Sequence, residues 1–418
     1  MKPSPARATA YEVVLRVFEQ DAYADRAFET AAEGLDSRDR GLAQRIAFGT
    51  VQRRRTLDHA IETLARRPIA RLDPQVRAAL RIAAYQLGYL DQVPAYAVVT
   101  ESVGLVRRAR LESAVGFTNA VGRRLAEGIR PLIAALPEST ALEAALKHSY
   151  PDWIAETWWR EWGPEEALEL MRAQNEAPET VVRRNGLRDG AAVAGVADPL
   201  IPGALRVERI DEAALAAGLI QPQSRASILT GLAVGVRDGE RVLDLCAAPG
   251  GKATQLAQWA AEVVAVELNE GRARELEETC RRLGATNVRV VQADGRRLPT
   301  ELAGFDRALV DAPCSGIGVL AFRPDLRWKS KPLPELQLEL LRAAAERVRP
   351  GGRVTFSTCA VNAAENEEIV DACGLELDDL GAEWPDFRHP RRPELLLTLP
   401  HRHATAGFFI ARLRVPAA

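Results

Sequence analysis

The chain has few of the residues that build metal sites, disulfide frameworks or membrane segments. Its 418 residues include five cysteines and five histidines, with no Cys-x-x-Cys pair and no cluster of histidines. This scarcity argues against structural zinc and against a disulfide scaffold, so we expect no metal and reduced thiols. No uninterrupted apolar run approaches 18 residues, and Lys-Pro-Ser-Pro follows Met1 where a signal peptide would be apolar. We therefore expect a soluble, cytoplasmic protein with no membrane partner.

Lysine is also scarce, at five residues, so arginine carries most of the positive charge. The net charge is −2, yet residues 1–130 hold 21 Lys and Arg against 15 Asp and Glu, an excess of six positive charges. Arginine pairs with phosphate through two parallel hydrogen bonds, so a basic helical surface there is expected to contact RNA. The alternative is that arginine has simply replaced lysine throughout the chain. The arginine clusters are Arg53–Arg55, Arg66–Arg67, Arg107–Arg108 with Arg110, and Arg123–Arg124.

The apolar pattern changes twice along the chain, which predicts three domains. From about residue 8 to 135 apolar residues recur at steps of three and four, typical of an all-α bundle of about seven amphipathic helices. The next segment combines a tryptophan-rich helix with short alternating stretches, so we expect a small α+β subdomain. Strand and helix patterns then alternate, as in a doubly wound α/β sheet. The predicted domains are 1–140, 141–218 and 219–418.

The stretch Arg241–Thr254 predicts a cofactor site in the third domain. A short apolar strand ends at Pro249-Gly250-Gly251, and a helical pattern follows. Glycine lets the backbone turn sharply and approach a ligand, and Glu267, at the end of the next apolar run, is placed to accept hydrogen bonds from a ribose. The motif is neither the dinucleotide G-x-G-x-x-G nor the phosphate loop G-x-x-x-x-G-K-[ST]. We therefore predict S-adenosylmethionine rather than NAD or ATP.

Polar residues follow the later predicted strands as well. Asp294 follows the apolar run 288–291, Asp311 and Cys314 follow 308–310, and Cys359 follows 354–356. Ligands bind at the carboxyl ends of the strands in open α/β sheets, so we expect both cysteines to reach one crevice from neighbouring strands. Helices are predicted at 254–259, 270–283, 334–348 and 364–373, and a final strand at 407–411.

Two thiols in one crevice suggest methylation at carbon 5 of cytosine. That carbon is a poor nucleophile, so a thiolate must first add at carbon 6, and a second group helps to release the product. A free thiol has a pKa of about 8.5, so the site must favour the anion or accept its proton. Asp311 is positioned to hydrogen-bond the N3/N4 edge of the base. The other three cysteines are interpreted as packing residues.

Three motifs resemble the signatures of the Sun-type (NOL/NOP/Sun) RNA cytosine-C5 methyltransferases. They are Cys-Ala-Ala-Pro-Gly-Gly-Lys (246–252), Asp-Ala-Pro-Cys-Ser-Gly-Ile-Gly (311–318) and Ser-Thr-Cys-Ala-Val-Asn-Ala-Ala-Glu-Asn (357–366). The resemblance covers nearly the whole chain. It implies a NusB-like helical RNA-binding domain, a ferredoxin-like subdomain and a Rossmann-like class I methyltransferase domain. Family members of this architecture act on 16S rRNA, so that RNA is the expected substrate and partner.

The resemblance also implies roles for individual residues. Cys359 would be the nucleophile and Cys314 would assist product release. Asp311 is predicted as the third catalytic residue from its expected hydrogen bond to the base. The presence of Pro313-Cys314 together with Thr358-Cys359 indicates the RNA class, because the DNA enzymes use the Pro-Cys cysteine itself as nucleophile. The implied cofactor contacts are Cys246, Ala247, Ala248, Pro249, Gly250, Gly251, Lys252, Glu267, Asp294 and Asp311.

Other interpretations stay open at this point. The target is alternatively transfer RNA or another rRNA site. A non-catalytic RNA-binding assembly factor with the same fold would have lost a catalytic residue, and none is missing. An amino-group methyltransferase would carry an Asn/Asp-Pro-Pro-Tyr motif where this chain has Asp311-Ala312-Pro313-Cys314. We expect the chain to work as a monomer.

Overall fold

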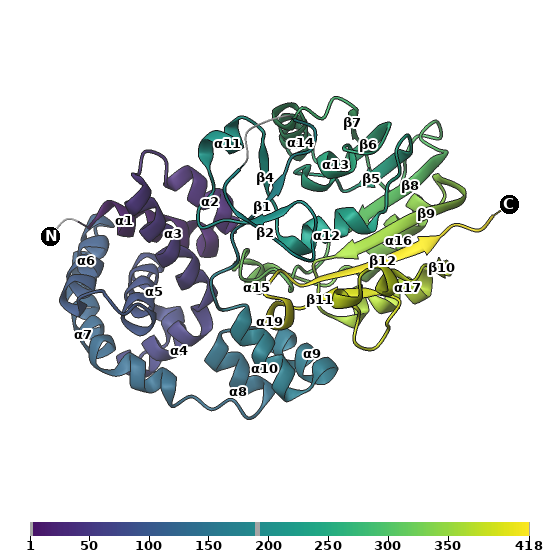
Figure 1. Ribbon diagram of the computed structural model, residues 1–418. Helices are drawn as coiled ribbons and strands as arrows, with labels where there is room; N and C mark the ends of the chain where they lie inside the picture. The colour runs from purple at the N-terminus through teal and green to yellow at the C-terminus, as the bar shows by residue number, and fades with distance from the viewer. Residues whose placement is uncertain (1–2, 189–192, 418) are drawn as a thin grey trace. The chain divides into compact units, whose positions relative to one another are not determined.

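The computed structural model describes residues 3–188 and 193–417 (Figure 1). The chain divides into two compact units. Unit 1 consists of Met1–Asn175 and Leu320–Lys329, and unit 2 of Glu176–Val319 and Ser330–Ala418. The domain boundaries expected after residues 140 and 218 stay predictions. None of the helices in the described ranges has both the length and the apolar character needed to cross a membrane.

Unit 1 opens with the predicted helical bundle. Helix starts follow local chemistry: Pro74, whose φ is already helical, begins α5, and the Asp36 carboxylate caps α3 by accepting from the Asp39 backbone N–H. The described residues up to 134 form α1 (Pro5–Glu19), α2 (Ala24–Ala31), α3 (Ser37–Gln52), α4 (Arg54–Ala65), the 3-10 turn η1 (Ile69–Arg71), α5 (Pro74–Tyr89), α6 (Ala95–Arg108) and α7 (Glu112–Ala134).

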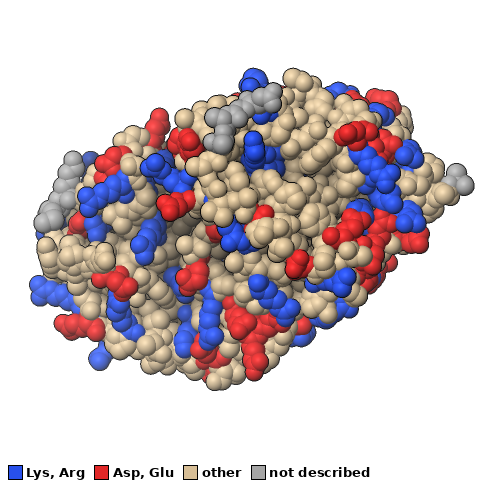
Figure 2. All heavy atoms as spheres, viewed as in Figure 1, with Lys and Arg blue, Asp and Glu red and all other residues tan. Residues whose placement is uncertain are grey.

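The arginine clusters of this bundle separate into two groups. Arg53, Arg54 and Arg55 are half-buried and pack inside unit 1: Arg54 lies over the Phe18 and Trp328 rings, and Arg55 donates to the Tyr150 carbonyl. The remaining clustered arginines are exposed. Figure 2 shows such basic side chains mixed with acidic ones over the face drawn. The exposed arginines are Arg66, Arg67, Arg107, Arg108, Arg110, Arg123 and Arg124.

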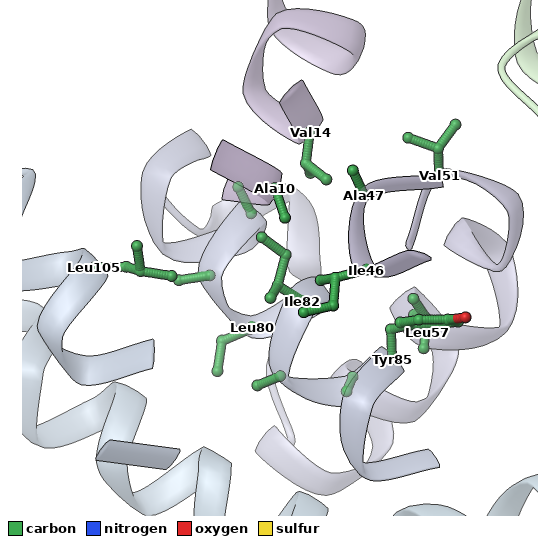
Figure 3. Close-up of a cluster of buried hydrophobic side chains, with 14 of the residues drawn as sticks. Ala10, Val14, Ile46, Ala47, Val51, Leu57, Leu80, Ile82, Tyr85 and Leu105 are labelled. Atoms are coloured by element: carbon green, nitrogen blue, oxygen red, sulfur yellow. The ribbon is translucent and has the colours of Figure 1, made fainter. Parts of the chain in front are cut away.

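The bundle is held by an aliphatic core (Figure 3). Ile46 and Ile82 are fully buried at its centre, and each buried side chain of this size contributes roughly 1.5–3 kcal/mol. One glycine in α3 is required by close packing. A Cβ added at Gly49 would lie 2.0 Å from Cζ of Tyr85, so only glycine lets the ring sit against the helix.

Three further helices complete the continuous part of unit 1. Thr140 and Glu143 form a capping box at the first of them. Trp158 is fully buried, with its ring 5.4 Å from that of Tyr150, whereas the neighbouring tryptophans are half-buried. The helices are α8 (Ala141–His148), α9 (Asp152–Trp162) and α10 (Pro164–Ala173).

Residues 320–329 belong to unit 1 although they follow the Asp-Ala-Pro-Cys motif in sequence. Arg327, on α15 (Leu326–Lys329), is buried, donates to the carbonyls of Ser149 and Gln174, and lies 4.0 Å from the Tyr150 ring. The Trp328 indole donates to the Val51 carbonyl over 2.7 Å. A guanidinium that satisfies several carbonyls anchors the segment, because buried carbonyls need donors.

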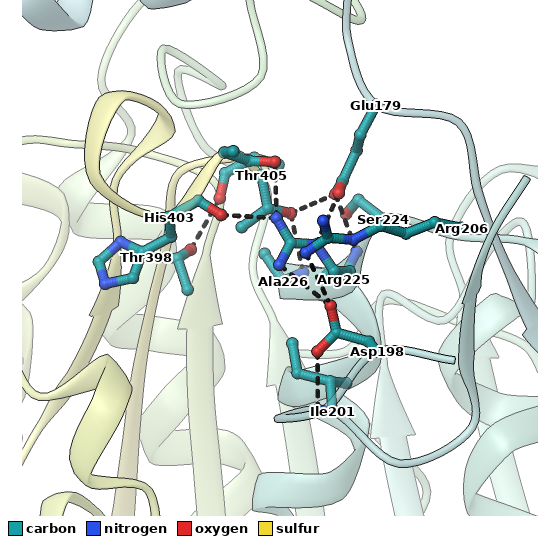
Figure 4. Close-up of polar contacts among 12 residues, drawn as sticks. Glu179, Asp198, Ile201, Arg206, Ser224, Arg225, Ala226, Thr398, His403 and Thr405 are labelled. Atoms are coloured by element: carbon teal, nitrogen blue, oxygen red, sulfur yellow. Dashed lines mark hydrogen bonds and ion pairs between the residues drawn. The ribbon is translucent and has the colours of Figure 1, made fainter. Parts of the chain in front are cut away.

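Unit 2 contains a small antiparallel sheet in the order β2-β3-β1-β4 within the described residues. Arg225, three residues after this sheet's last strand, is buried, pairs with Glu179 (2.7 Å) and Asp198 (3.2 Å), and donates to the Ala404 carbonyl (Figure 4). A buried charge needs such partners to offset its desolvation. The elements are β1 (Val181–Arg184), β2 (Val196–Ala197), β3 (Ala204–Arg206), α11 (Glu212–Ala216) and β4 (Ile220–Pro222).

The larger sheet of unit 2 carries the predicted alternating strands. Its order in the described residues is β10-β12-β9-β8-β5-β6-β7, with β11 paired to β12. Strands β5 to β9 are parallel, and β12 is antiparallel to β9. The strands are β5 (Arg241–Leu245), β6 (Glu262–Glu267), β7 (Val288–Gln292), β8 (Phe305–Asp311), β9 (Val348–Thr358), β10 (Glu376–Leu377), β11 (Leu396–Thr398) and β12 (Phe408–Arg414).

Helices cover both faces of this sheet, as the doubly wound prediction required. Val242 and Ala265 point into a core with α13 and α14, whereas Leu245, on the other face of β5, lies near Leu340 of α16. The predicted helix 270–283 is confirmed as α14, while α13 begins three residues earlier than predicted. The helices and turns are α12 (Arg225–Ala233), α13 (Gly251–Leu256), α14 (Glu270–Leu283), α16 (Pro334–Ala345), η2 (Ala363–Glu365), α17 (Glu367–Cys373), α18 (Leu380–Glu383), η3 (Pro385–Phe387) and α19 (Pro400–His403).

Candidate active site

The loop after β5 turns the backbone sharply at two positions. Cys246 has a φ of 63° and Gly250 a φ of 104°. A Cβ at Gly250 would lie 2.7 Å from Cδ1 of Leu276, so glycine is needed for both conformation and space. Ala247 and Ala248 are buried and Pro249 is exposed, and Gly251 and Lys252 begin α13. The predicted cofactor loop 246–252 therefore lies at the carboxyl end of the central strand β5.

Glu267 ends β6, the strand beside β5, and its carboxylate is buried. Oε1 accepts from the Asn269 backbone N–H over 3.0 Å, and Oε2 has no hydrogen-bond donor among the described residues. The Arg272 guanidinium lies 3.5 Å from Oε2 as an ion pair. A buried carboxylate oxygen with an open lone pair is well suited to accept from a bound hydroxyl group.

Asp294 lies beyond β7 and is bound to a neighbour. Arg296 hydrogen-bonds both of its carboxylate oxygens, and these bonds lower the pKa of Asp294 to about 2. Asp294 is therefore a fixed anion at the rim of the predicted site. Its carboxylate is engaged by the chain itself, in contrast to that of Glu267.

Asp311 ends β8 and is held by two groups. Lys252 Nζ donates to Oδ2 over 2.7 Å and Ser357 Oγ donates to Oδ1 over 2.7 Å. The Lys252 ammonium also lies 5.2 Å from the Phe408 ring at the start of β12. Asp311 and Ser357 face each other in the β8/β9 register, which brings the cofactor loop and both cysteine motifs together. Ser357 and Phe408 were not predicted as site residues.

Cys314 and Cys359 meet, with their Sγ atoms 3.3 Å apart. They follow the neighbouring strands β8 and β9, as predicted, and both side chains are partly exposed. The hydrogen bond with Cys359, together with loss of solvent, raises the pKa of Cys314 well above that of a free thiol. Cys314 is therefore protonated at neutral pH and is available as a hydrogen-bond donor to the sulfur of Cys359.

Asp244 is a buried residue that sequence reasoning missed. It lies within β5, is 1% exposed, and neither carboxylate oxygen meets a hydrogen-bond donor among the described residues. Burial, and then the nearby Asp311 charge, raise the pKa of Asp244 well above its ordinary value. The sequence signal was one acidic residue inside an apolar strand, immediately before the glycine loop.

The remaining cysteines behave as packing residues. Burial raises the pKa of Cys246 to about 12 and that of Cys280 to about 11, so neither is a nucleophile at neutral pH. Cys373 is half-buried and donates to the Val370 carbonyl. Within the described ranges, no three His, Cys, Asp or Glu side chains gather as metal ligands would.

Comparison with known proteins places this geometry in a family. Residues 232–414 match the model of the 16S rRNA methyltransferases RsmB/F, and residues 4–127 match that of the NusB family. A probable ribosomal RNA small subunit methyltransferase B of Synechocystis is 32% identical, over 98% of this chain and 99% of that protein. The chain belongs to the RsmB/F family of 16S rRNA methyltransferases. The predicted family and the NusB-like domain are thereby confirmed.

Solved structures agree with the fold. The crystal structure of the protein PH0851 superposes with a TM-score of 0.82 at 24% identity, covering 99% of both chains. NSun6 from Pyrococcus horikoshii, solved with SFG, gives a TM-score of 0.59 at 23% identity over 65% of this chain and 100% of that one. The multidomain architecture with a Rossmann-like methyltransferase domain is confirmed.

Members of this family are RNA methyltransferases that use S-adenosylmethionine, which confirms the predicted cofactor. The residues present fit that group. The glycine turn leaves room for close approach, and the open lone pair on the buried Glu267 carboxylate suits a ribose hydroxyl. When bound, S-adenosylmethionine supplies an activated methyl group on a sulfonium centre.

The raised pKa of Asp244 predicts how the stability of the fold changes with pH. An acid whose pKa is higher in the folded than in the unfolded state adds stability below its ordinary pKa of about 3.9, and this is lost as pH rises through the folded pKa. Wild type should therefore lose more stability than Asp244→Asn as the pH rises from 5 to 8. Urea unfolding at both pH values measures this. Asp238→Asn, on an exposed loop, is the control, and equal pH dependence in wild type and Asp244→Asn would contradict the assignment.

Proposed function

We propose that this enzyme methylates carbon 5 of a cytosine in 16S rRNA through a covalent bond from Cys359 to carbon 6 of the base. One observation carries the proposal. Two thiols lie 3.3 Å apart at the ends of neighbouring strands, beside a carboxylate fixed by Lys252 and Ser357. Methylation at an exocyclic nitrogen needs no thiol pair, whereas activation of carbon 5 needs a nucleophile and a group for release.

The roles of the two thiols follow from the motif resemblance, in which Cys359 serves as the nucleophile and Cys314 as its hydrogen-bond donor. The 3.3 Å contact between the two sulfur atoms suits this division. The Cys359 thiolate adds to carbon 6, and the displaced π electrons make carbon 5 nucleophilic toward the methyl group. A base then removes the carbon-5 proton, the C6–S bond breaks, and the Cys314 thiol stabilises the departing thiolate by a hydrogen bond.

Asp311 orients the base in this proposal. Its two oxygens each accept one bond from the chain, from Lys252 and Ser357, and each retains a second lone pair. Because it is held from both sides, the carboxylate keeps its position when a cytosine enters, and it accepts from the N4 amino group or from a protonated N3.

The cofactor contacts follow from the loop and strand ends. The backbone of residues 246–252 and the Glu267 carboxylate are the groups that we assign to S-adenosylmethionine. Asp294 and Asp311 complete the set expected from the sequence. Arg296 donates to both oxygens of the Asp294 carboxylate. Asp294 therefore contacts the cofactor only through a second lone pair on one of those oxygens.

The NusB-like domain supplies the expected RNA contact. Arg66 and Arg67 follow α4, and Arg123 and Arg124 lie on α7, which packs against that helix. The Arg124 guanidinium donates to the Leu64 carbonyl, and Arg67 lies over the Phe117 ring, so the two pairs share one surface. Exposed guanidinium groups beside an aromatic ring suit a phosphate backbone with unstacked bases.

The two-thiol assignment predicts different behaviour for the two cysteine variants. Transfer of labelled methyl from S-adenosylmethionine to unmodified 16S rRNA should stop in Cys359→Ala. Cys314→Ala should turn over roughly 10²–10⁴-fold more slowly and accumulate a protein–RNA adduct. Cys280→Ala, with a buried thiol on α14, is the matched control. Full activity in Cys359→Ala excludes the nucleophile assignment, and labelling of tRNA alone moves the substrate to tRNA.

The cofactor assignment predicts a loss of affinity in Glu267→Ala. Losing charged hydrogen bonds to a ribose should weaken S-adenosylmethionine binding roughly 10- to 100-fold by isothermal titration calorimetry. Glu262→Ala is the control, since Glu262 lies on the same strand and pairs with Arg241 at 3.0 Å. Equal affinity in both variants would rule Glu267 out as a ribose ligand.

The RNA surface predicts a change in salt dependence. Replacing Arg66 and Arg123 by glutamine should weaken 16S rRNA binding and reduce the slope of log K against log salt by about one unit per lost phosphate contact. Arg38 and Arg160, which are also exposed on unit 1, give the matched double variant. An unchanged slope in the first variant would show that this surface does not bind phosphate.

A further inference from the structure

Glu365 is a buried carboxylate that lies beside the two thiols, and the proposed chemistry gives this carboxylate no role. It ends the turn η2 and is 0% exposed. A charged group is expensive to bury unless hydrogen bonds replace the lost water. The contacts of Glu365 therefore indicate why the fold retains a carboxylate at this position.

Donors from three separate segments converge on this carboxylate. Oε1 accepts from the backbone N–H groups of Ser315 (2.9 Å) and Leu333 (3.1 Å) and from Gln337 Nε2 (2.9 Å). Oε2 accepts from the Ser315 hydroxyl and from Asn362 Nδ2 (2.8 Å). Among the described residues these donors use both oxygens fully, which an amide or an apolar side chain would not do.

The three segments are the ones that place the cysteines. Ser315 directly follows Cys314, after β8, while Asn362 lies three residues after Cys359, after β9. Gln337, in the first turn of α16, also donates to the Pro313 carbonyl over 2.9 Å. Residues on both sides of Cys314 are thus bound, directly or through Gln337, to the segment that carries Cys359.

The charge of Glu365 acts on the same thiol. Its negative field adds to the hydrogen bond and to the loss of solvent in raising the pKa of Cys314. A neutral side chain of the same shape would lose this field. The hydrogen bonds of Glu365 and its charge therefore both act on Cys314.

We propose that Glu365 is a positioning residue that holds Cys314 against Cys359 for the release of the methylated cytosine. The inference rests on the proposed two-thiol function and deepens it. Glu365 makes no contact with the reacting atoms in this proposal. It acts through the Ser315 backbone, the Ser315 hydroxyl and Gln337.

The test is whether Glu365→Gln resembles Cys314→Ala rather than a destabilised enzyme. In Glu365→Gln one carboxylate oxygen becomes an amide that faces the Ser315 and Asn362 donors, so the loop should shift and Cys314 should lose its place. With S-adenosylmethionine and unmodified 16S rRNA, the full-length variant should give at least tenfold more denaturation-resistant protein–RNA adduct per released 5-methylcytosine than wild type. The adduct should disappear in the Glu365→Gln/Cys359→Ala double variant.

Glu367→Gln is the matched control, because Glu367 is a largely buried carboxylate two residues away. It pairs with His389 at 2.9 Å and with Arg391 at 3.3 Å, and within the described residues neither ion pair involves a cysteine loop. Loss of stability alone lowers adduct and product together, so this control should not raise their ratio. Thermal unfolding of all variants is measured alongside.

Ser315→Ala tests the same link with less disturbance, in case Glu365→Gln does not fold. It removes one hydroxyl donor and keeps the carboxylate, so a smaller rise in the adduct ratio is expected. An unchanged ratio in the folded variants, with wild type forming 5-methylcytosine, overturns this inference alone. Wild type that forms no 5-methylcytosine overturns the proposed function, and this inference with it.

Discussion

The site depends on the parallel pairing of β8 with β9. Their register sets Asp311 opposite Ser357, and this places the two cysteine loops side by side with the thiols 3.3 Å apart. A shift of one residue would turn every side chain of the shifted strand to the opposite face of the sheet. The bond from Ser357 to Asp311 and the anchoring of Ser315 by Glu365 hold this register at its carboxyl end. Chemistry that needs two thiols in contact therefore rests on the alignment of one strand pair.

Buried and half-buried polar groups surround that strand pair and differ in how many hydrogen bonds they make. Glu365 accepts from donors on both oxygens, and Asp311 is held by Lys252 and Ser357. Asp244 and one oxygen of Glu267 lack hydrogen-bond donors in the described part of the chain. Satisfied groups fix loops, whereas groups with open lone pairs at strand ends are the natural ligand positions. This contrast distinguishes Glu365, the proposed positioning residue, from Glu267, a proposed cofactor ligand, although both are buried glutamates.

Unit 1 shows how one residue type serves two purposes. Arg54, Arg55 and Arg327 use flat guanidinium groups to stack on rings and to satisfy carbonyls inside the unit. Arg66 and Arg123 are exposed, which leaves their charge available to a phosphate. Arginine remains charged when buried and offers five donors, so it suits both positions. A count of basic residues alone would have overestimated the RNA surface.

The resemblance of three motifs was sufficient for the family. The sequence alone was also sufficient for the helical bundle, the parallel strands, the glycine turn at residues 246–252 and the arrival of Cys314 and Cys359 at the ends of neighbouring strands. These features depend on local periodicity, on backbone conformations that glycine permits, and on the rule that parallel strands end at one edge of a sheet. Only the tertiary structure decided the protonation of Cys314, the partners of Glu365, the burial of Asp244 and the membership of residues 320–329 in unit 1. Each of these depends on contacts between residues far apart in sequence and on the loss of water around them, and no local pattern encodes either.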